Sequence, residues 1–156
     1  GTLSDMPEKP IRVLHVDDQR LWRSTVSDYL TLFGDYEITS AESGEQALDL
    51  LRTNPFDIII SDYQMPEMNG IEFLHHVRTR GTSTPFIFLS GIRQEDIEQE
   101  AKGSDVDFYV IKTGDPSQVF SDLSQKIHLA IARYATVQAL MNKQMEDFGP
   151  SSFLSG

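Results

Sequence analysis

The feature that most constrains this chain is a five-fold alternation of short, β-branched apolar runs with longer segments of helical periodicity. The runs occupy residues 11–16, 36–41, 56–60, 85–89 and 106–111, and a helical pattern follows each of them. No hairpin signal joins two consecutive runs, so neighbouring strands are not expected to be antiparallel. The pattern predicts an α/β domain: a parallel sheet with five helices on its two faces, joined by right-handed crossovers.

Composition excludes several classes of protein. The 156 residues are 39% hydrophobic and 24% charged, which is typical of a globular domain. The formal net charge of −11 opposes attraction to nucleic acid phosphates or anionic lipid. The chain has no cysteine, which excludes disulfides and thiolate metal sites and is compatible with the cytoplasm. No apolar run approaches the length of a membrane span. The first residue is glycine, so we expect a processed chain or a fragment of a longer one.

Ionisable or hydroxyl side chains follow four of the five runs. Asp17-Asp18 follow the first, Asp62 the third, Ser90 the fourth and Lys112 the fifth. Each has a common structural explanation by itself, as a helix cap, a turn residue or a solvated charge. Together they are better explained by a site, because ligands bind beyond the carboxyl ends of parallel strands. In a flavodoxin-like strand order 2-1-3-4-5, the first and third strands are neighbours, and the three aspartates would share one pocket.

Three neighbouring carboxylates repel one another and need a counter-charge. Lys112 and a hard divalent cation such as Mg²⁺ can both supply it, and Mg²⁺ suits an oxygen-only site that leaves exchangeable waters. Asp62 would then act as a nucleophile toward phosphorus and form an acyl phosphate. Lys112 and the Ser90 hydroxyl would surround the charge that a phosphoryl group brings.

The residues at these positions resemble the receiver domain of two-component response regulators. "VLHVDDQ", "DIIISDYQMPEMNGIEFL", "PFIFLSG" and "DFYVIK" match, in order and spacing, the family's acidic pair, phosphoacceptor loop, hydroxyl switch and lysine. The resemblance covers about residues 10 to 133. It implies a phosphoacceptor switch that takes a phosphoryl group from a sensor histidine kinase or a phosphotransfer protein, and not an enzyme in its own right. The chain would be a standalone regulator or a part of a larger regulator or hybrid kinase.

The resemblance also assigns roles to individual residues. It implies phosphorylation of Asp62, with Mg²⁺ held by Asp17, Asp18, Asp62 and the backbone carbonyl of Gln64. The residues expected around the phosphoryl group or in its switch are Ser90, Gly91, Tyr109 and Lys112. Gly91 is expected to keep the site reachable because it is small. One departure stands out: the family usually places a proline after this lysine, whereas Thr113 follows here. The loop after Lys112 is therefore expected to differ in shape.

The last helical pattern is longer than a receiver domain requires. Apolar residues recur at heptad spacing, at Phe120, Ile127, Tyr134, Met141 and Phe148 and again at Leu123, Ala130 and Val137. We expect a flexible leader over 1–9, a receiver domain over 10–133 and a helical extension and tail over 134–156. Two interpretations of the extension stay open: it folds back or frays, or it pairs with a second copy as a parallel coiled coil.

Other functions are less well supported by the residues. A haloacid-dehalogenase-like phosphatase also uses Asp, Ser or Thr and Lys around Mg²⁺, but its nucleophile lies near the first strand in a D-x-D motif, and here Gln64 stands two residues after Asp62. A DNA-binding regulator lacks its recognition helix in this chain. A histidine kinase based on His128 lacks the usual flanking residues. His15 is expected to be a packed strand residue, and His75-His76 diverge on a helix.

Overall fold

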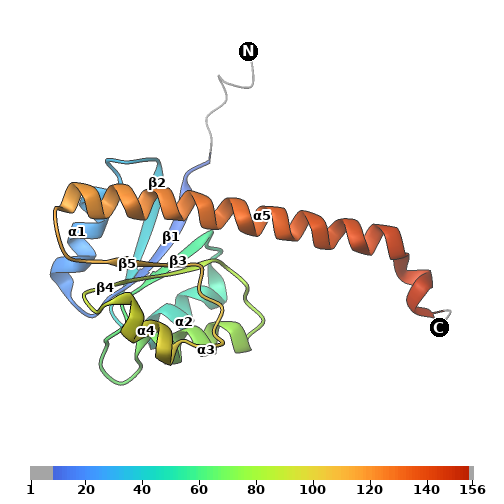
Figure 1. Cartoon of the computed structure of the whole chain (residues 1–156), viewed down its shortest axis with the longest axis horizontal. Helices are drawn as coiled ribbons and strands as arrows, with labels where there is room; N and C mark the ends of the chain where they lie inside the picture. Colours follow the sequence, from blue (N-terminus) through green and yellow to red (C-terminus); the bar gives the residue numbers. More distant parts are fainter. Residues whose placement is uncertain (1–8, 155–156) are drawn as a thin grey trace, which may run out of the picture.

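The computed structural model describes residues 9–154, and their side chains as far as Phe148. Most of the predicted leader, and the last two residues of the predicted tail, lie outside the described residues. One parallel sheet runs through the domain in the order β2-β1-β3-β4-β5, which confirms the predicted order (Figure 1). Its strands are β1 (Ile11–Val16), β2 (Tyr36–Ala41), β3 (Ile58–Ser61), β4 (Phe86–Ser90) and β5 (Phe108–Ile111).

Helices cover both faces of this sheet. They are α1 (Arg20–Leu30), α2 (Gly44–Thr53), α3 (Gly70–Thr79), α4 (Gln94–Glu100) and α5 (Pro116–Leu154). Helices α1 and α5 pack side by side on one face, while α2 and α3 pack together on the other (Figure 1). Successive residues of a strand point to opposite faces, so each strand contributes to two cores.

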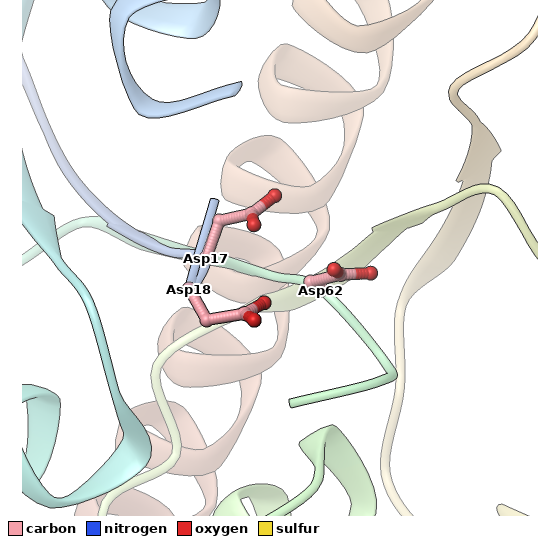
Figure 2. Close-up of side chains that lie close together, drawn as sticks. All are labelled: Asp17, Asp18 and Asp62. Carbon is pink, nitrogen blue, oxygen red and sulfur yellow. The ribbon is translucent and has the colours of Figure 1, made fainter. Parts of the chain in front are cut away.

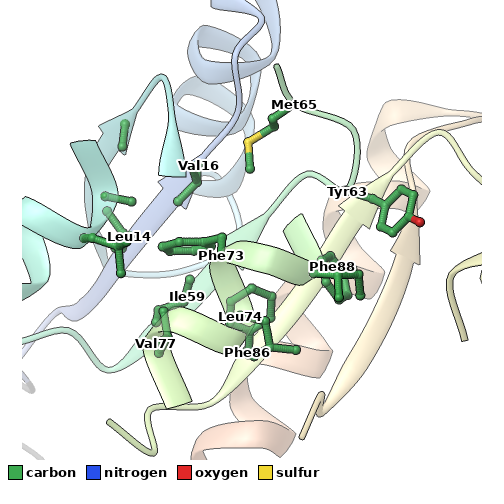
Figure 3. Close-up of a cluster of buried hydrophobic side chains, with 14 of the residues drawn as sticks. Leu14, Val16, Ile59, Tyr63, Met65, Phe73, Leu74, Val77, Phe86 and Phe88 are labelled. Carbon is green, nitrogen blue, oxygen red and sulfur yellow. The ribbon is translucent and has the colours of Figure 1, made fainter. Parts of the chain in front are cut away.

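The two cores are made of fully buried apolar side chains. On the α2–α3 face, Leu14, Ile59, Phe73, Phe86 and Phe88 are all 0% exposed (Figure 3). On the α1–α5 face the corresponding residues are Val13, Ile58, Ile60, Phe120, Leu123 and Ile127. Burial of each such side chain contributes about 1.5–3 kcal/mol. With both faces filled, the open ends of the strands are where polar side chains can meet a ligand.

Strands β3, β4 and β5 begin later than predicted. The carboxylate of Asp57 accepts the Arg12 N–H at 2.8 Å, and that of Asp107 accepts the Phe86 N–H at 2.8 Å. Each aspartate thus supplies a side-chain acceptor just before its strand begins, while its own backbone N–H already bonds the neighbouring strand. Strands β3 and β4 also end one residue later, because Ser61 and Ser90 still pair with Val16 and Ile111.

The helix ends differ from the sequence expectation in detail. The Ser43–Gln46 spacing predicts a capping box at the start of α2. Ser43 does accept the Gln46 N–H at 3.1 Å, but the Gln46 side chain accepts the Glu42 N–H, so the box does not close. A complete capping box does occur at α3, where Asn69 and Glu72 satisfy each other's backbone N–H groups. Sequence reasoning did not identify it. The helical pattern predicts that Gly34 ends the first helix, but α1 already ends at Leu30.

Helix α5 continues well beyond the sheet. Phe120, Leu123, Ile127 and Ala130 are 0% exposed, whereas Val137 is 44% exposed and Phe148 59% exposed. The extension projects away from the domain as a continuation of the same helix rather than folding back on it (Figure 1). Within the part of the chain that the structure describes, no helix combines the length and apolar character needed to cross a bilayer.

Candidate functional site

Three aspartates meet at the carboxyl end of the two central strands. Strand β1 delivers Asp17 and Asp18, and strand β3 delivers Asp62, as Val16 and Ser61 pair in register just before them. One carboxylate oxygen from each lies within 4.8 Å of the others (Figure 2). Asp17 is 0% exposed and Asp62 6% exposed, whereas Asp18 is open to solvent. The predicted grouping is therefore present, with one exposed and two buried members.

Lys112 supplies a cation to this group from the end of β5. Its ammonium lies 2.6 Å from Asp17 Oδ2 and 3.3 Å from Asp62 Oδ2. Strand β4 separates β5 from β3, so the long lysine side chain reaches across the Ser90 tip to meet them. The lysine side chain is only 8% exposed. A single ammonium therefore serves two buried carboxylates.

The Asp62 carboxyl responds to this environment with a raised pKa. Burial is the largest cause, and the Asp17 charge adds to it, while Lys112 and a hydrogen bond from Ser90 act in the opposite direction. The direction shows that Lys112 does not fully compensate for the burial of Asp62 and its closeness to Asp17. A second cation at the cluster would favour ionised Asp62. Three carboxylate ligands of which one is exposed suit a hard cation that keeps part of its water shell.

Asp17 is held firmly, and Asp18 is not a helix cap. Asp17 Oδ1 accepts the Gln19 N–H at 2.9 Å, and the backbone carbonyl of Asp17 accepts from Arg23 at 2.9 Å. The N-cap of α1 is Gln19, whose side chain makes no capping hydrogen bond. The common structural explanation for Asp18, as the cap of α1, is therefore wrong, and its exposed carboxylate faces the same cluster (Figure 2).

The remaining predicted residues lie around one cavity of about 440 Å³. Its lining includes Asp62, Gln64, Ser90, Gly91, Lys112 and Thr113. Ser90 is 2% exposed, and its hydroxyl accepts the Ile92 N–H at 3.2 Å. At Gly91 an added Cβ would meet no atom within 4 Å, so protein packing does not require glycine there. In the loop after Lys112, where the family usually has a proline, the described peptide bonds are trans and Gly114 adopts φ 105°.

Tyr109 lies apart from this cavity, on the α4 side of the sheet. Its ring stacks on Phe88 with the centroids 5.9 Å apart, and burial raises the pKa of its hydroxyl. Phe88 lies on β4, the strand that ends in Ser90, so the Phe88 ring that contacts Tyr109 and the Ser90 hydroxyl are on the same strand. The structure thus places Tyr109 beside β4 but not beside the aspartates.

Sequence reasoning missed the site roles of two residues. The Lys112 ammonium lies 4.7 Å from the centroid of the Trp22 ring, and Trp22 also lines the cavity. Gly70 begins α3 directly against the backbone of Asp62, where a Cβ would collide with the Asp62 carbonyl oxygen and lie 2.6 Å from the Phe88 ring. The Asn-Gly pair at the start of α3 was the available signal for Gly70.

Comparison with known proteins gives a consistent picture. The profile of the family described as "Response regulator receiver domain" matches residues 13–124. A probable chemotaxis protein CheY of Rhizobium etli is 43% identical over 86 residues, which is 55% of this chain and 67% of that protein. Response regulator MprA of a Mycobacterium species is 28% identical over 145 residues, 92% of this chain, and the chain spans only 56% of its length. The structure of chemotaxis response regulator CheY4 of Vibrio cholerae superposes with a TM-score of 0.68 at 32% identity, covering 76% of this chain and 99% of that one.

Proposed function

Since this chain belongs to the response regulator receiver domain family, we propose that Asp62 is its phosphoacceptor and that a histidine kinase or a phosphotransfer protein is the donor. One observation carries the proposal: Asp62 stands at a strand tip within reach of Asp17, Asp18 and Lys112. Among the aspartates described at the strand tips, it is the one that shares its cavity with Ser90 and Lys112. The activities of the longer relatives are not carried over, because this chain matches only part of their length.

The transfer itself is a displacement at phosphorus. An Asp62 carboxylate oxygen attacks, an O–P bond forms, and the P–N bond of a phosphohistidine breaks with its electron pair passing to the imidazole nitrogen. Lys112 must leave part of its contact with Asp17 to approach the phosphoryl oxygens. The Ser90 hydroxyl also lines the cavity and can donate to a phosphoryl oxygen.

We assign the metal site to Asp17, Asp18, Asp62 and the backbone carbonyl of Gln64, with Mg²⁺ as the ion. The donor set fits, because it consists of oxygens only and has one member exposed enough to share the ion with water. The ion would neutralise charge on the phosphoryl group during transfer. Asp17 fixes the geometry of the set through its bonds to Gln19 and Arg23.

The output of the switch is proposed to involve Ser90 and Tyr109. A phosphoryl group on Asp62 brings new acceptor oxygens, and a shift of Ser90 toward them moves the end of β4. The Tyr109 ring stacks on Phe88 of this strand, so a movement of β4 would also move the Tyr109 ring. Helix α4 is anchored by Ile97 and Ala101, which are 1% and 3% exposed, and its short length makes it the most readily displaced element.

We regard the domain as a signalling module rather than a phosphatase. The nucleophile is on β3 and not at the first strand, and the residue two positions later is Gln64. A catalytic acid–base aspartate at that position would be expected in the haloacid-dehalogenase-like alternative. The net charge of −11 disfavours nucleic acid as a partner of this chain, and we place its action in the cytoplasm.

The test is phosphorylation by acetyl phosphate with Mg²⁺, followed by intact mass measurement. We expect the wild-type chain to gain one phosphoryl group, Asp62→Asn to gain none, and excess chelator to abolish the gain. Asp18→Asn is expected to weaken Mg²⁺ binding, so that more Mg²⁺ is needed, while Asp62 remains the phosphorylated residue. A phosphoryl group on Asp62→Asn would contradict the assignment.

We further propose that a second copy covers the exposed stripe of the α5 extension. Apolar residues at heptad spacing share a helix face, so Tyr134, Val137 and Met141 continue the face that carries Ile127 and Ala130 onto the sheet. A parallel partner helix on this face would run into the sheet of the first copy. This disfavours the parallel pairing expected from the sequence.

An antiparallel partner avoids this collision, because it overlaps the first copy only beyond Tyr134. Arg133 and Asp147 lie two heptads apart on one flank of the stripe, so Arg133 of one copy approaches Asp147 of the other. Such a short overlap buries on the order of 1,000 Å², which is typical of weak association.

Sedimentation at tens of micromolar should show a dimer that is lost on truncation after Ala135. Since the chain has no cysteine, single cysteines report the orientation. Val137→Cys alone should cross-link poorly, and a mixture of Val137→Cys with Met145→Cys efficiently. Efficient cross-linking of Val137→Cys with itself would favour parallel pairing. If the full chain and the truncated chain both sediment as monomers, the proposed dimer is wrong.

A further inference from the structure

Trp22 is the aromatic residue that stands over the site lysine. It lies in the first turn of α1, four residues after Asp18, and the Lys112 ammonium is 4.7 Å from its ring centroid. The same ammonium is 2.6 Å from Asp17 Oδ2. The lysine charge is thus enclosed by two carboxylates and one aromatic face, with only 8% of its side chain exposed.

The Trp22 indole contacts Lys112 on one side and the apolar core on the other. Trp22 packs against the apolar cluster between α1 and α5, which contains Val26 and Phe120. The start of α1 is tied to Asp17 through the Gln19 N–H, and Arg23 bonds the Asp17 carbonyl. These contacts hold the aromatic face beside Asp17, the carboxylate that binds Lys112.

This arrangement bears on how Lys112 can move. A lysine has a flexible stem and a strongly hydrated ammonium, so an open site would let it turn toward water. An aromatic face attracts the ammonium without competing for its hydrogen bonds. The attraction leaves the N–H groups of Lys112 directed at the carboxylates, where a phosphoryl oxygen would also lie.

We propose that Trp22 is a positioning residue for Lys112, which holds the ammonium over the site and keeps it from water as it transfers from Asp17 to a phosphoryl group on Asp62. Only the transfer of the ammonium to a phosphoryl group rests on the proposed function of Asp62. The contact between Trp22 and Lys112 is independent of it. Removing the aromatic face should weaken binding of a phosphoryl mimic, because Lys112 would have to be withdrawn from water first.

The first experiment tests the contact without metal or phosphoryl group. Trp22 is the only tryptophan of the chain, so the intrinsic emission reports this indole alone. Lys112→Met should change the emission intensity or maximum of the folded protein. Lys126→Met is the matched control, since Lys126 bonds Asp122 at 3.1 Å on α5, and it should leave the emission unchanged. Identical emission from wild type and Lys112→Met would overturn the proposal.

The second experiment tests the consequence. Affinity for beryllofluoride with Mg²⁺ is measured by calorimetry for wild type, Trp22→Phe and Trp22→Leu, with unfolding curves to verify that each is folded. We expect about tenfold weaker binding for Trp22→Leu and about threefold or less for Trp22→Phe, because phenylalanine retains a weaker aromatic face. Equal losses in both variants would show a packing role only, and no loss in either would contradict the proposal.

The phosphoacceptor role of Asp62 and the positioning role of Trp22 can be contradicted by different results. If Asp62 is not the phosphoacceptor, wild type and Asp62→Asn will bind the mimic equally, while the emission change on Lys112→Met will persist. If the positioning role is wrong, wild type will bind the mimic normally and Trp22→Leu will match it.

Discussion

Lys112 and Asp17 form a buried ion pair, 2.6 Å from Nζ to Oδ2, between residues that lie 95 positions apart in the chain. The contact joins the end of β5 to the end of β1 over the intervening strands. It is shorter than the 3.3 Å contact between Lys112 and Asp62. The lysine is therefore engaged mainly with Asp17 and stays close to Asp62.

Replacing Lys112 by methionine is predicted to destabilise the fold. It would leave the Asp17 carboxylate, which is fully buried, and Asp62 without their cation, and loss of one partner from a buried pair costs about 3–5 kcal/mol. Chemical denaturation in metal-free buffer measures the loss, and Mg²⁺ should restore part of it. Lys126→Met, which removes a partly exposed pair, should cost about 1 kcal/mol or less. Equal losses in the two variants would contradict the buried pairing.

Asp62→Asn is predicted to stabilise the metal-free protein near neutral pH. The raised pKa means that the folded state disfavours the charge, whereas the unfolded chain ionises near 3.8. The advantage of the variant is therefore present above the raised pKa and disappears as the pH falls below 3.8. Thermal midpoints at pH 7 should differ by a few degrees. Mg²⁺ should reduce this difference by stabilising wild type more than the variant, and an unchanged difference would argue against metal binding at Asp62.

His15 is predicted to make stability fall in mild acid. The side chain is fully buried on β1, and both ring nitrogens lack a partner among the described residues. Burial, with the Lys112 and Arg23 charges, lowers its pKa from 6.5 to about 3. The unfolded chain therefore takes up a proton first as pH falls below 6.5, and stability decreases by about 2 kcal/mol at pH 5. His15→Leu should remove this slope, measured by urea unfolding at several pH values, while the exposed His76→Leu should retain it.

Gly70→Ala is predicted to disrupt the site through its backbone. The new Cβ would collide with the Asp62 carbonyl oxygen and crowd the Phe88 ring, so α3 would have to move away from β3. We expect a loss of about 2–4 kcal/mol and slower phosphorylation. Gly91→Ala is the matched control, because its Cβ meets no atom within 4 Å. If both variants are equally stable, the close approach of Gly70 to Asp62 is not needed.

Much of the architecture was predictable because it depends on local pattern. Short apolar runs rich in β-branched residues predicted every strand, runs with period 3.6 predicted every helix, and the parallel pairing of the strands followed from the crossovers. The acidic and hydroxyl residues at the strand ends predicted the candidate site, since parallel strands present their carboxyl ends at one edge. The boundaries were less predictable, because Asp57 and Asp107 replace backbone acceptors through contacts with distant strands.

The sequence by itself determined which residues stand at the strand ends, and a flavodoxin-like strand order then predicted the cluster of Asp17, Asp18 and Asp62 with Lys112 beside it. Only the tertiary structure decided which carboxylate Lys112 prefers, that Trp22 stands over its ammonium, and that Gly70 must be small. It also decided which way the apolar stripe of α5 faces once the sheet ends. These features depend on distances between segments that are far apart in the chain, and such distances are set by the packing of both cores rather than by any local pattern.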